Sequence, residues 1–130
     1  MNALIFIKEE ESSFYISLIE KILKEIKFKK EYTFLKIGKE TKKSFISLLE
    51  KLETKTIVLI EEEIISSMNF KEKLLIADIS SKHVTLIPFK RIESTTIDTS
   101  KRVEEWRNDL DFDTNIYSQF LMFKTLVEEK

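Results

Sequence analysis

The sequence contains no cysteine and only one glycine, one proline and one histidine among its 130 residues. Without cysteine the chain forms no disulfide, no thiolate zinc site and no cysteine nucleophile, which is typical of cytoplasmic proteins. A single glycine excludes a G-x-G-x-x-G fingerprint and a P-loop, because both need several glycines where the backbone approaches phosphate closely. A lone histidine, His83, excludes a histidine-based metal cluster, so the sequence predicts no metal site.

The chain also lacks a strong charge bias and a long apolar run. Its 22 basic and 23 acidic residues give a net charge of −1, so no overall electrostatic attraction draws it to nucleic acid or to an anionic membrane. The N-terminal apolar stretch is only six residues long and acidic residues follow it, which fits neither a signal peptide nor a membrane span. We therefore expect a cytoplasmic protein with no nucleic-acid partner and no membrane partner.

What the sequence does contain is a regular alternation of two patterns. Short apolar runs predict strands at 3–7, 32–37, 56–60 and 83–89, and segments with apolar residues at helical spacing lie between them. The third of these helical segments carries Phe70, Leu74, Leu75 and Ala77 as its apolar residues. The order β-α-β-α-β-α-β is typical of an α/β fold with an open, mostly parallel sheet and helices on both faces, a flavodoxin-like three-layer arrangement.

The remaining elements complete this prediction. A fifth short strand is expected between Ile92 and Ile97, so the sheet has four to five strands. A last helix over about 114–128 packs on the domain through Ile116, Phe120, Phe123 and Val127. A length of 130 residues suits one domain spanning 1–130.

Three consecutive glutamates, Glu61 to Glu63, follow the third predicted strand. In an open α/β sheet ligands bind at the carboxyl ends of the strands, so an acidic site is one interpretation of this run. Receiver domains share the alternation, but they carry an aspartate phosphoacceptor where this chain has Glu61, which argues against that activity. We expect Glu61 to Glu63 to form a solvated loop.

The central stretch TIVLIEEEIISSMNFKEKLLIA, together with LIPF at 86–89, resembles the central part of a Toll/interleukin-receptor (TIR) domain. That family places a strand, a polar stretch, a serine and a helix with E-L-x-x-A before a strand that ends in I-P. The opening IFIKEEESSFYISLIEKIL resembles the family's first strand, polar loop and first helix, and Gly38 resembles the glycine before its second helix. The resemblance covers about residues 1–89. It implies a TIR-like signalling or defence module that acts mainly through assembly with a protein partner or with itself.

The resemblance also implies where NAD chemistry would lie. In catalytic members a glutamate on the third helix supports cleavage of the nicotinamide–ribose bond, because a carboxylate stabilises the oxocarbenium-like transition state. Pairing Ser67 with the family's serine places Lys73 at that position, whereas pairing Ser66 places Glu72 there, and both pairings remain open. On this basis Glu72 is the catalytic candidate. The candidate contacts to NAD, as ligand or substrate, are Lys8, Gly38, Ser66 and Ser67.

Two departures from the family pattern favour a non-catalytic module over an NAD glycohydrolase. The family's tryptophan is replaced by Asn69 or Met68, depending on the pairing. The glutamates after the first strand would repel the phosphates of NAD.

Two alternatives come from other classes of protein. One is a small non-catalytic component of a larger complex, like the protein called F in rotary ATPases. That protein has a similar β-α alternation and a late strand that ends in I-P, although its glycine-bearing first loop is missing here. The other alternative is a nucleoside deoxyribosyltransferase-like enzyme, which would use Glu61 or Glu72 as its nucleophile.

Overall fold

The computed structural model describes residues 3–129, apart from the side chains of Lys42 and Lys43. Its centre is a sheet of four parallel strands in the order β2-β1-β3-β4. The strands are β1 (Ala3–Lys8), β2 (Thr33–Ile37), β3 (Ile57–Glu61) and β4 (Thr85–Phe89). This confirms the predicted α/β fold with a parallel sheet.

The sheet forms because its two central strands are apolar on both faces. Successive side chains of a strand point to opposite sides, so a strand that is covered twice needs an unbroken apolar run. In β1, Ile5 and Ile7 belong to the core on one face, whereas Leu4 and Phe6 belong to the core on the other. The same alternation continues across β3, so the protein has two cores separated by the sheet.

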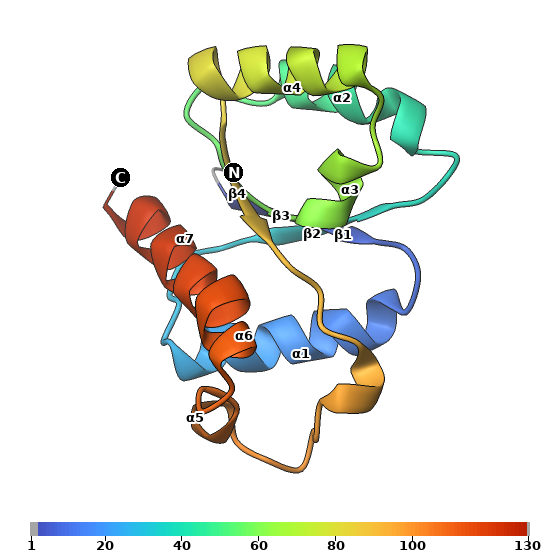
Figure 1. Cartoon of the computed structure of the whole chain (residues 1–130). Coiled ribbons are helices and arrows are strands. Elements are labelled where there is room, and N and C mark those ends of the chain that lie inside the picture. The colour runs from blue at the N-terminus through green and yellow to red at the C-terminus, as the bar shows by residue number, and fades with distance from the viewer. Residues whose placement is uncertain (1–2, 130) are drawn as a thin grey trace.

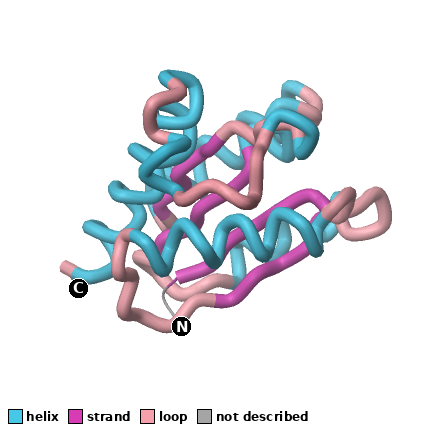
Figure 2. The backbone as a smooth tube through the Cα atoms, turned by 90° about the horizontal axis from the view of Figure 1, so that it is seen from below, coloured by secondary structure: helices cyan, strands magenta, loops and turns pink. Residues whose placement is uncertain are grey.

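The helices cover the sheet in two layers (Figure 1). One layer contains α2 (Lys42–Lys51), α3 (Glu62–Ser66) and α4 (Phe70–Lys82). The other contains α1 (Ser12–Glu25), α5 (Val103–Trp106), α6 (Leu110–Phe112), the π-helix η2 (Asp113–Tyr117) and α7 (Ser118–Glu128). Seen from below in Figure 2, the layer with α1 lies in front of the strands. None of the helices within residues 3–129 is long and apolar enough to cross a bilayer.

The C-terminal half differs from the prediction in one element. The segment between Ile92 and Ile97 forms the short 3₁₀ helix η1 (Ser94–Thr96), so the fifth strand predicted there is wrong. The reason is that this segment leaves the sheet after β4 and crosses towards α1, where Tyr15 donates a hydrogen bond to the carbonyl of Ile92. The predicted last helix is confirmed: α6, η2 and α7 follow one another without a break, and its four apolar residues are buried.

Helix α4 buries a narrower face than its apolar content suggests. Ile76 and Ile79 enter the core, while Phe70, Leu74 and Leu75 are exposed to 76%, 55% and 43%. Residues 70 and 74 lie one turn apart on the same side of the helix, which is opposite the side of residues 76 and 79. The phase of α4 therefore leaves its larger apolar residues in solvent.

Candidate functional site at the carboxyl edge of the sheet

The strand order places a crevice at the carboxyl ends of β1 and β3. The chain leaves β1 through α1 and returns to β2 on one side of the sheet, whereas it leaves β3 through α3 and α4 and returns to β4 on the other side. Neighbouring strands whose connections diverge in this way create the switch point at which open α/β folds bind ligands. The residues after β1, β2 and β3 are therefore the first place to look for a site.

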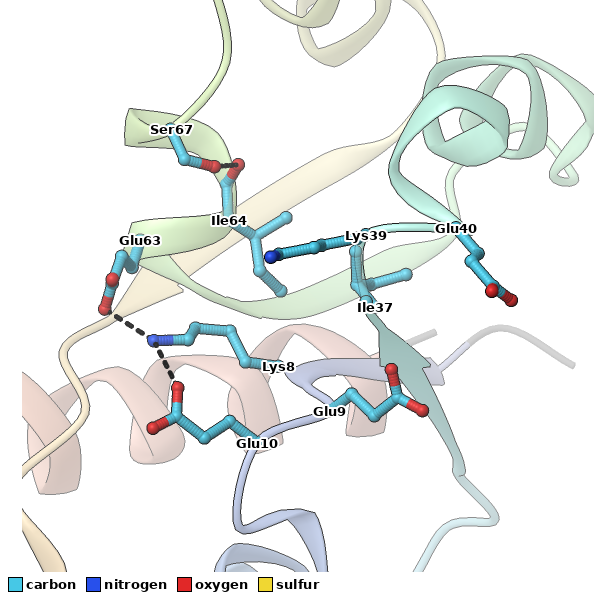
Figure 3. Close-up of a pocket in the computed structure, with 10 residues that line it drawn as sticks. Lys8, Glu9, Glu10, Ile37, Lys39, Glu40, Glu63, Ile64 and Ser67 are labelled. Carbon is cyan, nitrogen blue, oxygen red and sulfur yellow. Dashed lines mark hydrogen bonds and ion pairs between the residues drawn. The ribbon is translucent and has the colours of Figure 1, made fainter.

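A cleft of about 760 Å³ lies there (Figure 3). This size is in the range of small-molecule sites. Its lining comes from three segments: Lys8, Glu9 and Glu10 at the end of β1, Ile37, Gly38, Lys39 and Glu40 after β2, and Glu63, Ile64 and Ser67 from and just after α3. The side chain of Glu9 lies against Gly38 so closely that a Cβ at residue 38 would collide with its carboxylate, which explains the glycine.

The structure brings three of the five predicted site residues to this cleft. Lys8, Gly38 and Ser67 line it, whereas Ser66 and Glu72 do not. The Ser66 hydroxyl donates to the carbonyl of Glu63 at 3.3 Å, and the Ser67 hydroxyl donates to the carbonyl of Ile64 at 3.1 Å. Both contacts are local bonds of a helix end.

Glu72 forms part of the cap of α4. The backbone N–H of Asn69 donates to Glu72 Oε1 at 2.9 Å, and the backbone N–H of Glu72 donates to Asn69 Oδ1 at 2.8 Å. This reciprocal pair is a capping box, which satisfies backbone groups that a helix start leaves open. Lys73, the other residue that the TIR pairing offers, does not line the cleft either.

The ammonium group of Lys8 is already paired inside the cleft. Its Nζ lies 2.9 Å from Glu63 Oε2 and 4.0 Å from Glu10 Oε2, as the dashed lines of Figure 3 show. The hydrogen bond and the charge of Lys8 lower the pKa of Glu63. Lys8 therefore has little free charge to offer an anionic ligand.

Glu61 corrects the prediction of a solvated glutamate loop. It is the last residue of β3 and only 1% exposed, while Glu62 and Glu63 begin α3. Its carboxylate forms an ion pair with Arg91 and accepts a hydrogen bond from the backbone N–H of Lys8 at 3.2 Å. Burial raises the pKa of Glu61, and the hydrogen bond and charge of Arg91 oppose that rise. A carboxylate buried in this way is closed to a substrate, which removes Glu61 as a nucleophile.

Arg91 is the functional-looking residue that the sequence does not reveal. Its guanidinium donates to the carbonyl of Glu10 at 2.6 Å and to the carbonyl of Lys8 at 3.3 Å, and its central carbon lies 3.8 Å from the ring centroid of Tyr15. The segment after β4 is thereby fixed to the loop between β1 and α1. Within the sequence it is one cation in a polar connection, and no local pattern links it to a glutamate 30 residues earlier.

A second cleft of about 510 Å³ adjoins the first and shares Lys8, Glu10 and Glu63 with it. Among the described residues that line the two clefts, three cations stand against six exposed carboxylates. We call these six the acidic edge: Glu9, Glu10, Glu11, Glu40, Glu63 and Glu93. Lys8 and Arg91 are already paired, and Lys39 is the one of the three cations that has no ion pair with a described side chain.

The chemistry of the acidic edge is that of binding a cation. In the part of the chain that the structure describes, no three histidine, cysteine, aspartate or glutamate side chains are arranged to hold a metal ion. The backbone of Glu11 has a φ of 52°, a value that side chains other than glycine rarely adopt, and its carboxylate accepts a hydrogen bond from Ser94 at 3.0 Å. The loop between β1 and α1 is thus held in an uncommon conformation that presents its glutamates at the edge.

The chain matches no protein-family model, no curated protein and no solved structure. Its function is therefore argued from the geometry of the site.

Proposed function

We propose that this protein is a non-catalytic module that acts through protein–protein assembly and binds a basic segment of its partner at the acidic edge. The observation that carries the proposal is the convergence of six exposed carboxylates at the carboxyl ends of the strands. Charge complementarity of this kind selects the partner and speeds its association. A lysine- or arginine-rich segment fits two adjoining clefts better than a compact anion does.

The same charges argue against NAD as the ligand. A dinucleotide brings two phosphates, and stable phosphate binding needs free cations or backbone N–H groups. Lys8 is neutralised by Glu63, which leaves Lys39 to face the carboxylates of Glu9 and Glu40. The carboxylate of Glu72 is engaged in the cap of α4. The proposal therefore keeps the assembly role that the TIR resemblance implies and omits NAD cleavage.

A peptide-binding measurement tests the proposal. Fluorescence anisotropy should show a labelled lysine-rich peptide binding at low ionic strength, and a glutamate-rich peptide of the same length should not bind. The variant Glu40→Lys/Glu93→Lys should weaken binding by about tenfold or more, a free-energy change of about 1.4 kcal/mol. Glu50→Lys on α2 is the matched control, because Glu50 is exposed and lies outside both clefts.

Two results would refute this function. One is equal binding of the two peptides, and the other is an identical loss in the edge variant and the Glu50→Lys control. Co-purification from cells then identifies the partner, which separates a signalling or defence assembly from a component of a larger machine.

A further inference from the structure

Helix α4 presents an apolar surface that the fold does not use. We call its exposed residues Phe70, Leu74, Leu75 and Ala77 the α4 ridge. The core contacts of the helix come from Ile76 and Ile79 on its other side. In Figure 1, α4 lies at the outer limit of its layer, with α2 beside it and no element above it. Contiguous exposed apolar residues on one element are typical of an interaction site.

We propose that the α4 ridge binds the α4 ridge of a second copy of this chain, with the two helices antiparallel. The reason lies in the charges that flank the ridge. Lys71 and Asp78 are seven residues apart, which is close to two full turns, so both lie on the same flank of the helix. In an antiparallel pair centred between Leu74 and Leu75, Lys71 of each copy lies opposite Asp78 of the other.

The two candidate ion pairs are open to a second copy. Lys71 is exposed and has no ion pair with a described side chain. Asp78 pairs with Lys82 at 2.8 Å but is 60% exposed, so it remains accessible to another cation. Antiparallel packing also brings the N-terminal end of each helix dipole near the C-terminal end of the other, which is favourable.

The size of the surface sets the strength of the association. A helix of 13 residues is about 20 Å long, and a stable dimer commonly buries about 800 Å² on each copy. The ridge alone is smaller than such an interface. The dimer is therefore in reversible exchange with the monomer, and dimerisation depends on protein concentration.

Sedimentation equilibrium over a range of protein concentrations tests the proposal. The unmodified chain should show a monomer–dimer equilibrium, and Leu74→Glu should raise its dissociation constant at least tenfold. Leu110→Glu is the matched control, because Leu110 is 73% exposed on α6 in the opposite helical layer. Circular dichroism confirms that both variants are folded.

A charge exchange tests the antiparallel arrangement. Lys71→Glu and Asp78→Lys should each weaken the dimer, because each places like charges opposite one another, and the double variant should restore it. Lys73→Glu changes the net charge as Lys71→Glu does but lies on the other flank, so it should have a smaller effect. Within one helix, residues 71 and 78 are too far apart for the double variant to act internally.

Several outcomes overturn the proposal. They are a chain that stays monomeric up to millimolar concentration, an equal effect of Leu74→Glu and Leu110→Glu, and a double charge variant that fails to restore the dimer. Vesicle binding or capture of a different protein through the ridge, without self-association, overturns it as well. Binding of the lysine-rich peptide at the acidic edge should be the same in Leu74→Glu, so this proposal and the proposed function fail independently.

Discussion

Replacing Arg91 by methionine should destabilise the protein by about 3 kcal/mol at pH 7. Removal of one partner of a buried ion pair commonly costs about 3–5 kcal/mol, because the other charge stays buried without compensation. Glu61 is 1% exposed and Arg91 11%, so this pair is of the buried kind. We take the lower end because Glu61, whose pKa burial already raises, can bind a proton in the variant and so reduce the cost.

The loss should depend on pH in a defined direction. The pKa of Glu61 in the folded protein lies above its ordinary value of 4.5, so the folded state binds this proton more tightly than the unfolded state does. The Glu61 contribution to stability is therefore most favourable below pH 4.5 and decreases as the pH rises through the folded-state pKa. Without Arg91 that pKa rises further. The difference in unfolding free energy between the two proteins should be smallest near pH 4.5 and should grow towards pH 7.

Urea denaturation followed by circular dichroism at both pH values measures these differences. Arg102→Met is the matched control, because Arg102 is 76% exposed and its ion pairs with Glu104 and Glu105 lie on the surface. The double variant Glu61→Gln/Arg91→Met should recover at least half of the loss, since it leaves no buried charge. An Arg91→Met variant that is no less stable than Arg102→Met at pH 7 would refute the reasoning.

Three further predictions concern helix α4 and the core. Asn69→Ala should lower the free energy of unfolding by about 1 kcal/mol in urea denaturation, because it removes the side chain that caps α4; an unchanged midpoint would contradict the capping role. Incubation of the protein with NAD should release no nicotinamide in a chromatographic assay, and Glu72→Ala should lower the unfolding temperature without altering that result. Phe6→Ala should cost about 3–5 kcal/mol, because Phe6 is fully buried against Phe45 with ring centroids 5.4 Å apart, whereas Phe70→Ala should cost far less.

The sequence predicts the sheet well because its central strands are covered on both faces. An unbroken apolar run such as that of β1 or β3 has few other folded solutions at this length, so the pattern fixes both the strand and its central place. The helices that follow are predicted for the same reason, since α1 and α7 bury their whole apolar face. For α4 the pattern is insufficient, because its apolar residues occupy two faces and only tertiary packing selects Ile76 and Ile79.

The candidate site was predictable only in part, because its charges are paired over long distances in sequence. The position of Lys8, Gly38 and Ser67 at one edge follows from the parallel order of the strands, and they do line one cleft. The burial of Glu61 does not follow, because its counter-ion, Arg91, comes from the segment after β4. A glutamate at the end of a strand looks like a solvated residue until that partner is known.

The acidic edge and the α4 ridge would respond to salt in opposite ways, and this difference shows how one small domain can bind two partners independently. Exposed carboxylates attract a basic segment through charges that 0.15 M salt screens over about 8 Å, so binding at the edge should weaken steadily as salt is added. Burial of Phe70 and Leu74 at the ridge depends on the removal of apolar surface from water, which excluded salts such as sulfate strengthen. Screening of the two Lys71–Asp78 pairs offsets only part of that gain, because surface pairs contribute little. Added sulfate should therefore release a basic peptide while the dimer of the chain persists.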